Sequence, residues 1–136
     1  MRRPVATLVL LALGVAGCGG SSKSDEDAIR STIRTYFTAF ADGDGAKACD
    51  QLGSEVRGKI EQATKKDCPA ALEAAGRQPE IKRYIGQIRH VTVDEVDITG
   101  SNASAKVRAL GQTTTMPLHK VGGAWKIQDN QVATGG

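Results

Sequence analysis

The chain has few of the side chains on which metal binding and catalysis usually depend. Aromatic residues make up 4% of its 136 residues, and it contains two histidines, His90 and His119. Histidines so far apart offer no metal-ligand spacing. The glycines fall at turns rather than in a phosphate-binding pattern before a helix, and no nucleophile-elbow pattern appears. We therefore expect no metal and no cofactor.

Neither sign of charge is in large excess. The formal net charge is +3, and Arg2 and Arg3 precede an apolar run at the N-terminus. Without these two arginines, 16 of the 18 basic side chains remain against 15 acidic ones. Such a balance produces no strong field for nucleic acid or anionic lipid. We therefore expect no nucleic-acid partner.

The apolar run near the N-terminus is too short to cross a membrane. It covers roughly 14 residues, whereas a span needs about 20. Basic residues precede it, and Ala16, Gly17 and Cys18 follow it. This order resembles a bacterial lipoprotein signal, which implies that Cys18 carries a diacylglycerol and begins the mature protein. A permanent transmembrane helix and an ordinary cleaved secretory signal remain the alternatives.

This resemblance implies an extracytoplasmic protein that is anchored to the cell membrane by its N-terminal lipid. Two acyl chains hold a protein stably at a bilayer. We expect a signal peptide over 1–17 and a lipidated cysteine with a flexible Gly/Ser tether over 18–24. A single domain over 25–129 and a disordered tail over 130–136 complete the expected organisation.

The cysteine count agrees with this location. If Cys18 carries lipid, Cys49 and Cys68 remain as a natural pair, and disulfides persist outside the cytoplasm. A bridge between them would close a loop of roughly 20 residues. A metal site and a redox pair are the alternatives. No histidine lies near either cysteine and the spacing is not Cys-x-x-Cys, so we predict the disulfide.

Helical patterns fill the first part of the expected domain. An acidic capping box at Ser24–Asp27 precedes an apolar stripe at helical spacing, and the Asp42–Gly45 segment ends this helix. Further helices are predicted over 46–52, 55–63 and 69–75. Another is expected after Gln78-Pro79, where the apolar residues are Ile81, Tyr84, Ile85 and Ile88.

Strand patterns follow from His90. The spacing predicts strands over 91–98, 103–109, 113–121 and 124–127, with a bulge at Asp94-Glu95 and a hairpin turn at Gly122-Gly123. Helices followed by consecutive hairpins indicate an α+β domain, with the helices packed on one face of a curved antiparallel sheet of about four strands.

The order of these elements resembles the nuclear transport factor 2-like superfamily, whose cystatin-like α+β folds are cone-shaped. The residues that carry the resemblance are the opening segment over 28–44, Ala48-Cys49 with Leu52, and the closing segment over 118–127. The resemblance is strongest to the small envelope lipoproteins of this superfamily. It implies an apolar cone between sheet and helix. We expect Tyr36, Phe40, Met116 and Trp125 to line this cone, and the alternative is that they are ordinary core residues. A fold of this kind does not fix an activity.

Catalytic relatives place a carboxylate or histidine in the cone. The candidates here are Asp94 or Asp97 as a base and His119 as a base or acid, with Tyr36 or Tyr84 as a hydrogen-bond donor. None of them stands in a recognisable catalytic motif. The plainer interpretation is that Asp94 and Asp97 belong to a solvated strand face and that His119 is an ordinary strand residue.

Three functions are consistent with these observations. The first is a non-enzymatic binding or interaction module of the cell envelope, whose partner is a small apolar ligand or an envelope protein. The second is a small isomerase or cyclase with an acid–base residue in the cone. The third is a structural accessory subunit of an envelope complex.

Overall fold

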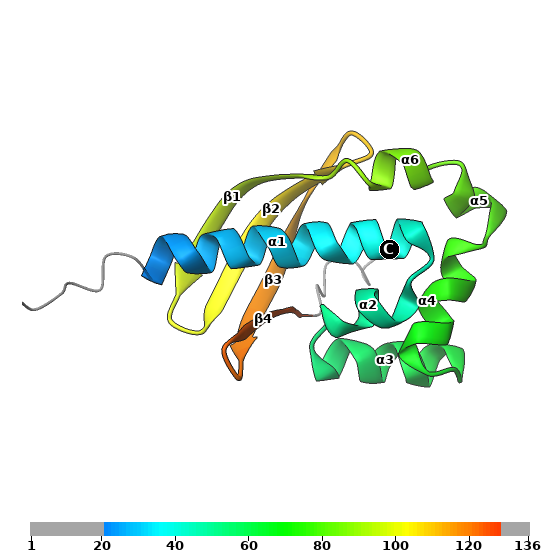
Figure 1. Ribbon diagram of the computed structural model, residues 1–136, viewed down its shortest axis with the longest axis horizontal. Helices are drawn as coiled ribbons and strands as arrows, with labels where there is room; N and C mark the ends of the chain where they lie inside the picture. The colour runs from blue at the N-terminus through cyan, green and yellow to red at the C-terminus, as the bar shows by residue number, and fades with distance from the viewer. Residues whose placement is uncertain (1–20, 129–136) are drawn as a thin grey trace, which may run out of the picture.

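The computed structural model describes residues 21–128, in which helices are followed by a sheet (Figure 1). The predicted signal peptide, Cys18 and the tail over 130–136 lie outside these residues. The described elements are α1 (Ser21–Asp42), α2 (Gly45–Asp50), α3 (Ser54–Thr64), α4 (Cys68–Gly76), α5 (Pro79–Lys82), α6 (Ile85–Ile88), β1 (Thr92–Thr99), β2 (Asn102–Ala109), β3 (Gln112–Val121) and β4 (Ala124–Ile127). The prediction of an α+β fold is confirmed.

The first helix starts earlier than its sequence predicts. Helix α1 begins at Ser21, so the last four residues of the predicted flexible tether are helical, and Ser24 lies inside the helix instead of capping it. Extending an existing helix adds one hydrogen bond per residue. Serine and lysine are tolerated in helices, so the packed stripe further along α1 can support this extra turn.

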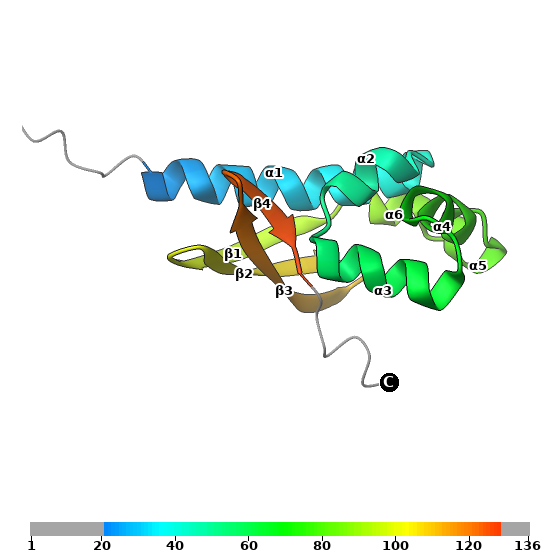
Figure 2. The same cartoon turned by 90° about the horizontal axis from the view of Figure 1, so that it is seen from below.

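Helix α1 lies across one face of the sheet (Figure 2). Its apolar stripe faces the strands, and Ile29 and Ile33 are completely buried there. Tyr36, Phe37 and Phe40 continue the stripe and are partly buried against the same core. The helix therefore buries its apolar face against the sheet, as its periodicity predicts.

The four strands form one antiparallel sheet in the order β1-β2-β3-β4. Alternate residues of β2 face the core: Ala103, Ala105 and Val107 are buried, whereas Lys106 and Arg108 are exposed. The register between β1 and β2 shifts between Val93 and Glu95, which confirms the predicted bulge. The outer face carries ion pairs, from Lys106 to Glu95 and from Arg108 to Asp94.

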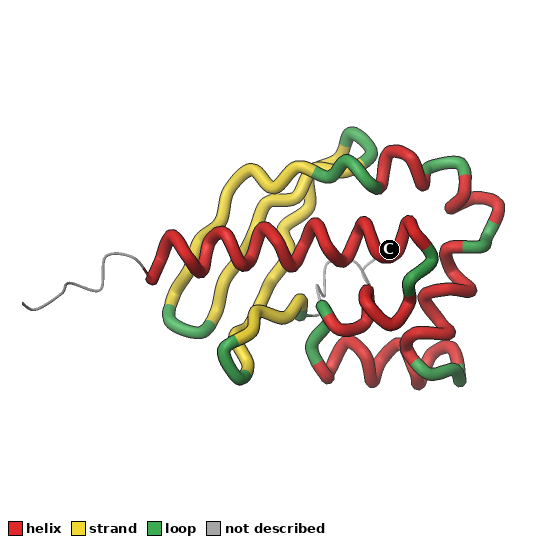
Figure 3. Tube along the Cα trace, in the orientation of Figure 1, coloured by secondary structure: helices red, strands yellow, loops and turns green. Residues whose placement is uncertain are grey.

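The shorter helices gather around the C-terminal half of α1, away from the centre of the sheet (Figure 3). A disulfide between Cys49 on α2 and Cys68 on α4 confirms the predicted pairing, with Cα atoms 6.1 Å apart.

The predicted helix after Pro79 is divided into the single turns α5 and α6. Ile88 is the only member of its apolar set that is buried, so little packing supports a continuous helix.

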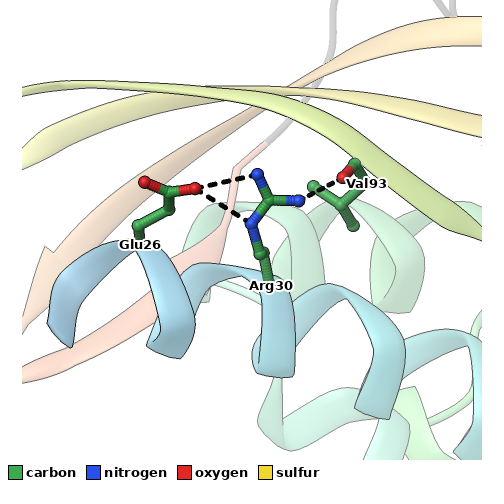
Figure 4. A network of polar contacts seen from close by, with 3 residues as sticks. All are labelled: Glu26, Arg30 and Val93. Atoms are coloured by element: carbon green, nitrogen blue, oxygen red, sulfur yellow. Dashed lines mark hydrogen bonds and ion pairs between the residues drawn. The ribbon is translucent and has the colours of Figure 1, made fainter. Parts of the chain in front are cut away.

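A side chain of α1 forms a hydrogen bond with the backbone of β1 at the bulge (Figure 4). Arg30 donates from Nη1 to the carbonyl oxygen of Val93. Its Nε and Nη2 donate to Oε1 of Glu26 at 3.1 and 2.8 Å. The bulge breaks the regular ladder of β1, and Arg30 satisfies a carbonyl at that point.

Candidate functional site

An open groove of about 470 Å³ lies between α1 and the end of the sheet where β2 meets β3. We call it the apolar groove. Helix α1 supplies two aromatic side chains, and the strands and their turn supply the rest. Its lining consists of Tyr36, Phe37, Val107, Ala109, Leu110, Gln112, Thr114 and Met116.

The strand register explains why these side chains meet. Thr114 lies opposite Val107, and Gln112 lies opposite Ala109, so alternate residues of both strands point to the helix side of the sheet. The side chains of β2 on this face are small, and alanines occupy positions 103, 105 and 109. Small side chains beneath the aromatic residues of α1 leave the space that forms the groove.

Tyr36 is the only titratable residue in the lining of the apolar groove. Burial raises the pKa of its phenol above the ordinary value, so the hydroxyl remains protonated near neutral pH. Its ring packs edge-on against Phe37, with centroids 5.2 Å apart. Among residues 21–128, no polar atom forms a hydrogen bond with its hydroxyl, and no buried side-chain oxygen or nitrogen is left without a partner. The hydroxyl is therefore not completely covered by the protein, and it can bond to a ligand in the groove.

The groove contains no charged side chain in its lining. Its polar groups are the neutral hydroxyls of Tyr36 and Thr114 and the amide of Gln112. Binding sites for small molecules usually combine an apolar wall with a few such polar groups, in cavities of about 300–1,000 Å³. The arrangement is therefore suited to an apolar or weakly polar ligand.

The structure brings together two of the four residues predicted to line a cone. Tyr36 and Met116 line the apolar groove. Phe40 lies further along α1 and lines a different hollow, and Trp125 is 3% exposed and belongs to the core. The Trp125 Nε1 donates to Asp25 at 3.0 Å, which keeps this ring over the N-terminal half of α1.

The acid–base candidates lie elsewhere. Asp94 and Asp97 are exposed on β1, and Asp94 pairs with Arg108 at 2.9 Å. His119 lies on β3, where its Nδ1 is 2.9 Å from the side-chain oxygen of Asn102. Tyr84, the second candidate donor, is 46% exposed between α5 and α6. None of these four residues lines the apolar groove.

A second hollow, of about 610 Å³, lies at the C-terminal end of α1. Its lining includes Phe40, Gly76 and Ile85 together with four charged residues, Asp42, Glu73, Arg77 and Lys82. Arg77 lies 3.8 Å from Glu73, and Asp42 pairs with Arg89. Side chains of both signs partly neutralise one another here, so the hollow has no clear preference for a ligand of one charge.

Sequence reasoning missed six of the eight residues that line the groove. The residues that were not predicted to line it are Phe37, Val107, Ala109, Leu110, Gln112 and Thr114. The signal that could have identified Leu110 is its position before Gly111, because a large apolar residue is unusual in a tight hairpin turn. The four strand residues become recognisable only when the register of β2 and β3 is known. Phe37 becomes recognisable only when the position of α1 over the sheet is known.

Two further findings concern residues 21–128. No helix in this range is long and apolar enough to cross a membrane. No group of three or more histidine, cysteine, aspartate or glutamate side chains within it could hold a metal ion.

In the comparisons with known proteins, the chain matches no protein-family model, no curated protein and no solved structure.

Proposed function

We propose that this protein is a lipid-anchored, extracytoplasmic binding module that takes up a small apolar ligand in the apolar groove. The observation that carries the proposal is the uncharged lining of the groove, in which Tyr36 lies beside apolar side chains. We further propose that the domain is a variant of the nuclear transport factor 2-like cone, because a long first helix crosses a four-stranded antiparallel sheet.

The proposed location is supported by the disulfide. The Cys49–Cys68 bridge joins α2 to α4, and such bridges persist mainly in oxidising compartments. The signal-like segment and Cys18 precede the described residues. Mass spectrometry of the protein purified from its native cells should find Cys18 at the amino terminus with acyl groups attached. A mature chain that begins at Met1 would contradict the anchor.

No observation favours the isomerase alternative strongly enough to propose it. Proton abstraction requires a base within reach of the substrate. The lining of the apolar groove offers no carboxylate and no imidazole, and the phenol of Tyr36 is held in its protonated form. The lining of the groove can therefore position a ligand and donate a hydrogen bond to it.

The binding proposal can be tested on the whole chain in lipid nanodiscs. A long-chain alcohol that carries a photoreactive diazirine serves as the probe, and mass spectrometry locates the labelled peptides. We expect saturable labelling of peptides that contain Tyr36 and Phe37 or Met116, and an excess of unlabelled alcohol should suppress it. Labelling confined to the outer sheet face, or no saturable labelling, would contradict the proposal.

A further inference from the structure

The turn between β2 and β3 holds a large apolar residue in an unfavourable backbone conformation. Leu110 has a φ of 54°, and Gly111 follows it with a φ of 74°. Positive φ at both central positions belongs to the hairpin turn in which Asn-Gly, Asp-Gly and Gly-Gly are preferred. A leucine in this region brings its Cβ close to the backbone, and such outliers gather at functional sites.

Leu110 also keeps its side chain partly in water. Leu110 is 46% exposed, and among the described residues only three large apolar side chains are exposed to this extent. Leu110 also lines the apolar groove. The residue therefore combines a strained backbone with incomplete burial, and core packing does not offset these costs. An asparagine or glycine would form the turn more easily, so the leucine side chain itself is the feature that needs an explanation.

We propose that Leu110 is a ligand-contacting residue that covers the open side of the apolar groove, and that the ligand is an uncharged amphiphile. The apolar body of the ligand packs between Leu110, Phe37 and Met116. Its polar group bonds with the hydroxyl of Tyr36. This inference rests on the proposed function and adds to it the chemical class of the ligand and the residue that closes over it.

The absence of charge from the lining decides the class of head group. A carboxylate or an ammonium group that enters the groove loses water, and no lining side chain of opposite charge compensates for this loss. A hydroxyl or carbonyl group costs less to desolvate, and the hydroxyls of Tyr36 and Thr114 and the amide of Gln112 can bond to it.

Two variants separate a role in binding from a role in folding. Leu110→Asn relieves the backbone strain in the turn and removes the apolar side chain. Lys65→Asn is the matched control, because Lys65 is the other non-glycine residue with positive φ among those described, and it caps α3 with a φ of 58°. Both substitutions should raise the melting temperature by roughly 4 °C, since asparagine tolerates this conformation.

The readout is the probe concentration that gives half-maximal labelling of the groove peptides, measured on the whole chain in nanodiscs. Leu110→Asn should raise this concentration roughly tenfold through the loss of apolar contact, and Lys65→Asn should leave it unchanged. Equal labelling of the wild type and Leu110→Asn would overturn the role of Leu110. The absence of saturable labelling in the wild type would instead overturn the proposed function on which this inference rests.

The head-group class is tested with a matched pair of probes, the photoreactive alcohol and the carboxylic acid of the same chain length. Near neutral pH the alcohol should half-saturate the groove at a concentration at least roughly tenfold lower than the carboxylate, because the ion leaves water without a partner. Equal or stronger labelling by the carboxylate would overturn the assignment of an uncharged ligand while leaving the groove as a binding site.

Discussion

The carboxylate of Asp25, in the first turns of α1, accepts a hydrogen bond of 3.0 Å from Nε1 of Trp125 on β4. The Nζ of Lys120 donates to the same oxygen at 2.8 Å and lies 5.7 Å from the centre of the tryptophan ring. These contacts join residues about a hundred positions apart in the chain. They hold the N-terminal half of α1 to the last hairpin, beside the buried stripe of the helix.

This cluster predicts a specific dependence of stability on pH. The hydrogen bond from Lys120, and then that from Trp125, lowers the pKa of Asp25 below its ordinary value of 3.8. A carboxylate whose pKa is lower in the folded state stabilises the fold when the pH is above the pKa of the unfolded state. This contribution disappears as the pH falls through the pKa of the folded state. Stability should therefore decline on acidification below about pH 4.

The test compares Asp25→Asn with Asp27→Asn, a nearby exposed position on the same helix. Urea unfolding between about pH 2 and about pH 6 gives the free energy of unfolding at each pH. Asp25→Asn should lower stability near neutral pH and flatten its acid dependence, whereas Asp27→Asn should retain the wild-type profile. Identical profiles for Asp25→Asn and the wild type would show that this cluster does not control acid stability.

The disulfide predicts a loss of stability on removal. Cys49 and Cys68 are 19 positions apart, and freeing a loop of this length should lower the free energy of unfolding by about 3 kcal/mol. The double variant Cys49→Ser, Cys68→Ser should show this loss in urea unfolding, and dithiothreitol should produce a similar loss in the wild type alone. A double variant as stable as the oxidised wild type would contradict the prediction.

Two glycines should respond to alanine in opposite directions. A Cβ on Gly45 would lie 2.1 Å from the carbonyl oxygen of Pro69, so α2 and α4 would have to separate. Gly58 lies inside α3 with no atom within 4 Å of the corresponding position. We expect Gly45→Ala to destabilise the fold by at least about 2 kcal/mol and Gly58→Ala to stabilise it by up to about 1 kcal/mol.

Thermal and urea unfolding of both glycine variants can check this contrast. A neutral effect of Gly45→Ala would mean that the approach of α2 to Pro69 is looser than the structure indicates. A loss of stability in Gly58→Ala would mean that the exposed face of α3 is not governed by helix propensity.

Local sequence patterns were sufficient for most of the architecture. The spacing of Ile29 and Ile33 predicts the buried face of α1, and alternation from Ala103 to Ala109 predicts the inner face of β2. The phase slip near Asp94 predicts the bulge. These features depend on residues that are close together in the chain, so they can be predicted from the sequence alone.

Features that depend on tertiary contact were not predictable in the same way. Ser24 looks like a helix cap, but α1 extends beyond it, and the acidic side chain next to it binds Trp125 instead of the end of the helix. Phe40 and Trp125 share the apolar character of Tyr36 and Met116, yet they pack elsewhere. Which apolar residues meet in the groove depends on how α1 crosses the strands, and this crossing leaves no periodic signal in the sequence.

The most direct test of the central claim uses two adjacent threonines on β3. Thr114 lines the apolar groove, whereas Thr113 points to the opposite face and pairs with Arg108; both are exposed. A phenylalanine at position 114 would fill the groove, and one at position 113 would not. In nanodiscs, Thr114→Phe should abolish saturable labelling of the groove peptides by the photoreactive alcohol, while Thr113→Phe labels like the wild type. Equal labelling of the two folded variants would contradict the assignment of the apolar groove as the binding site.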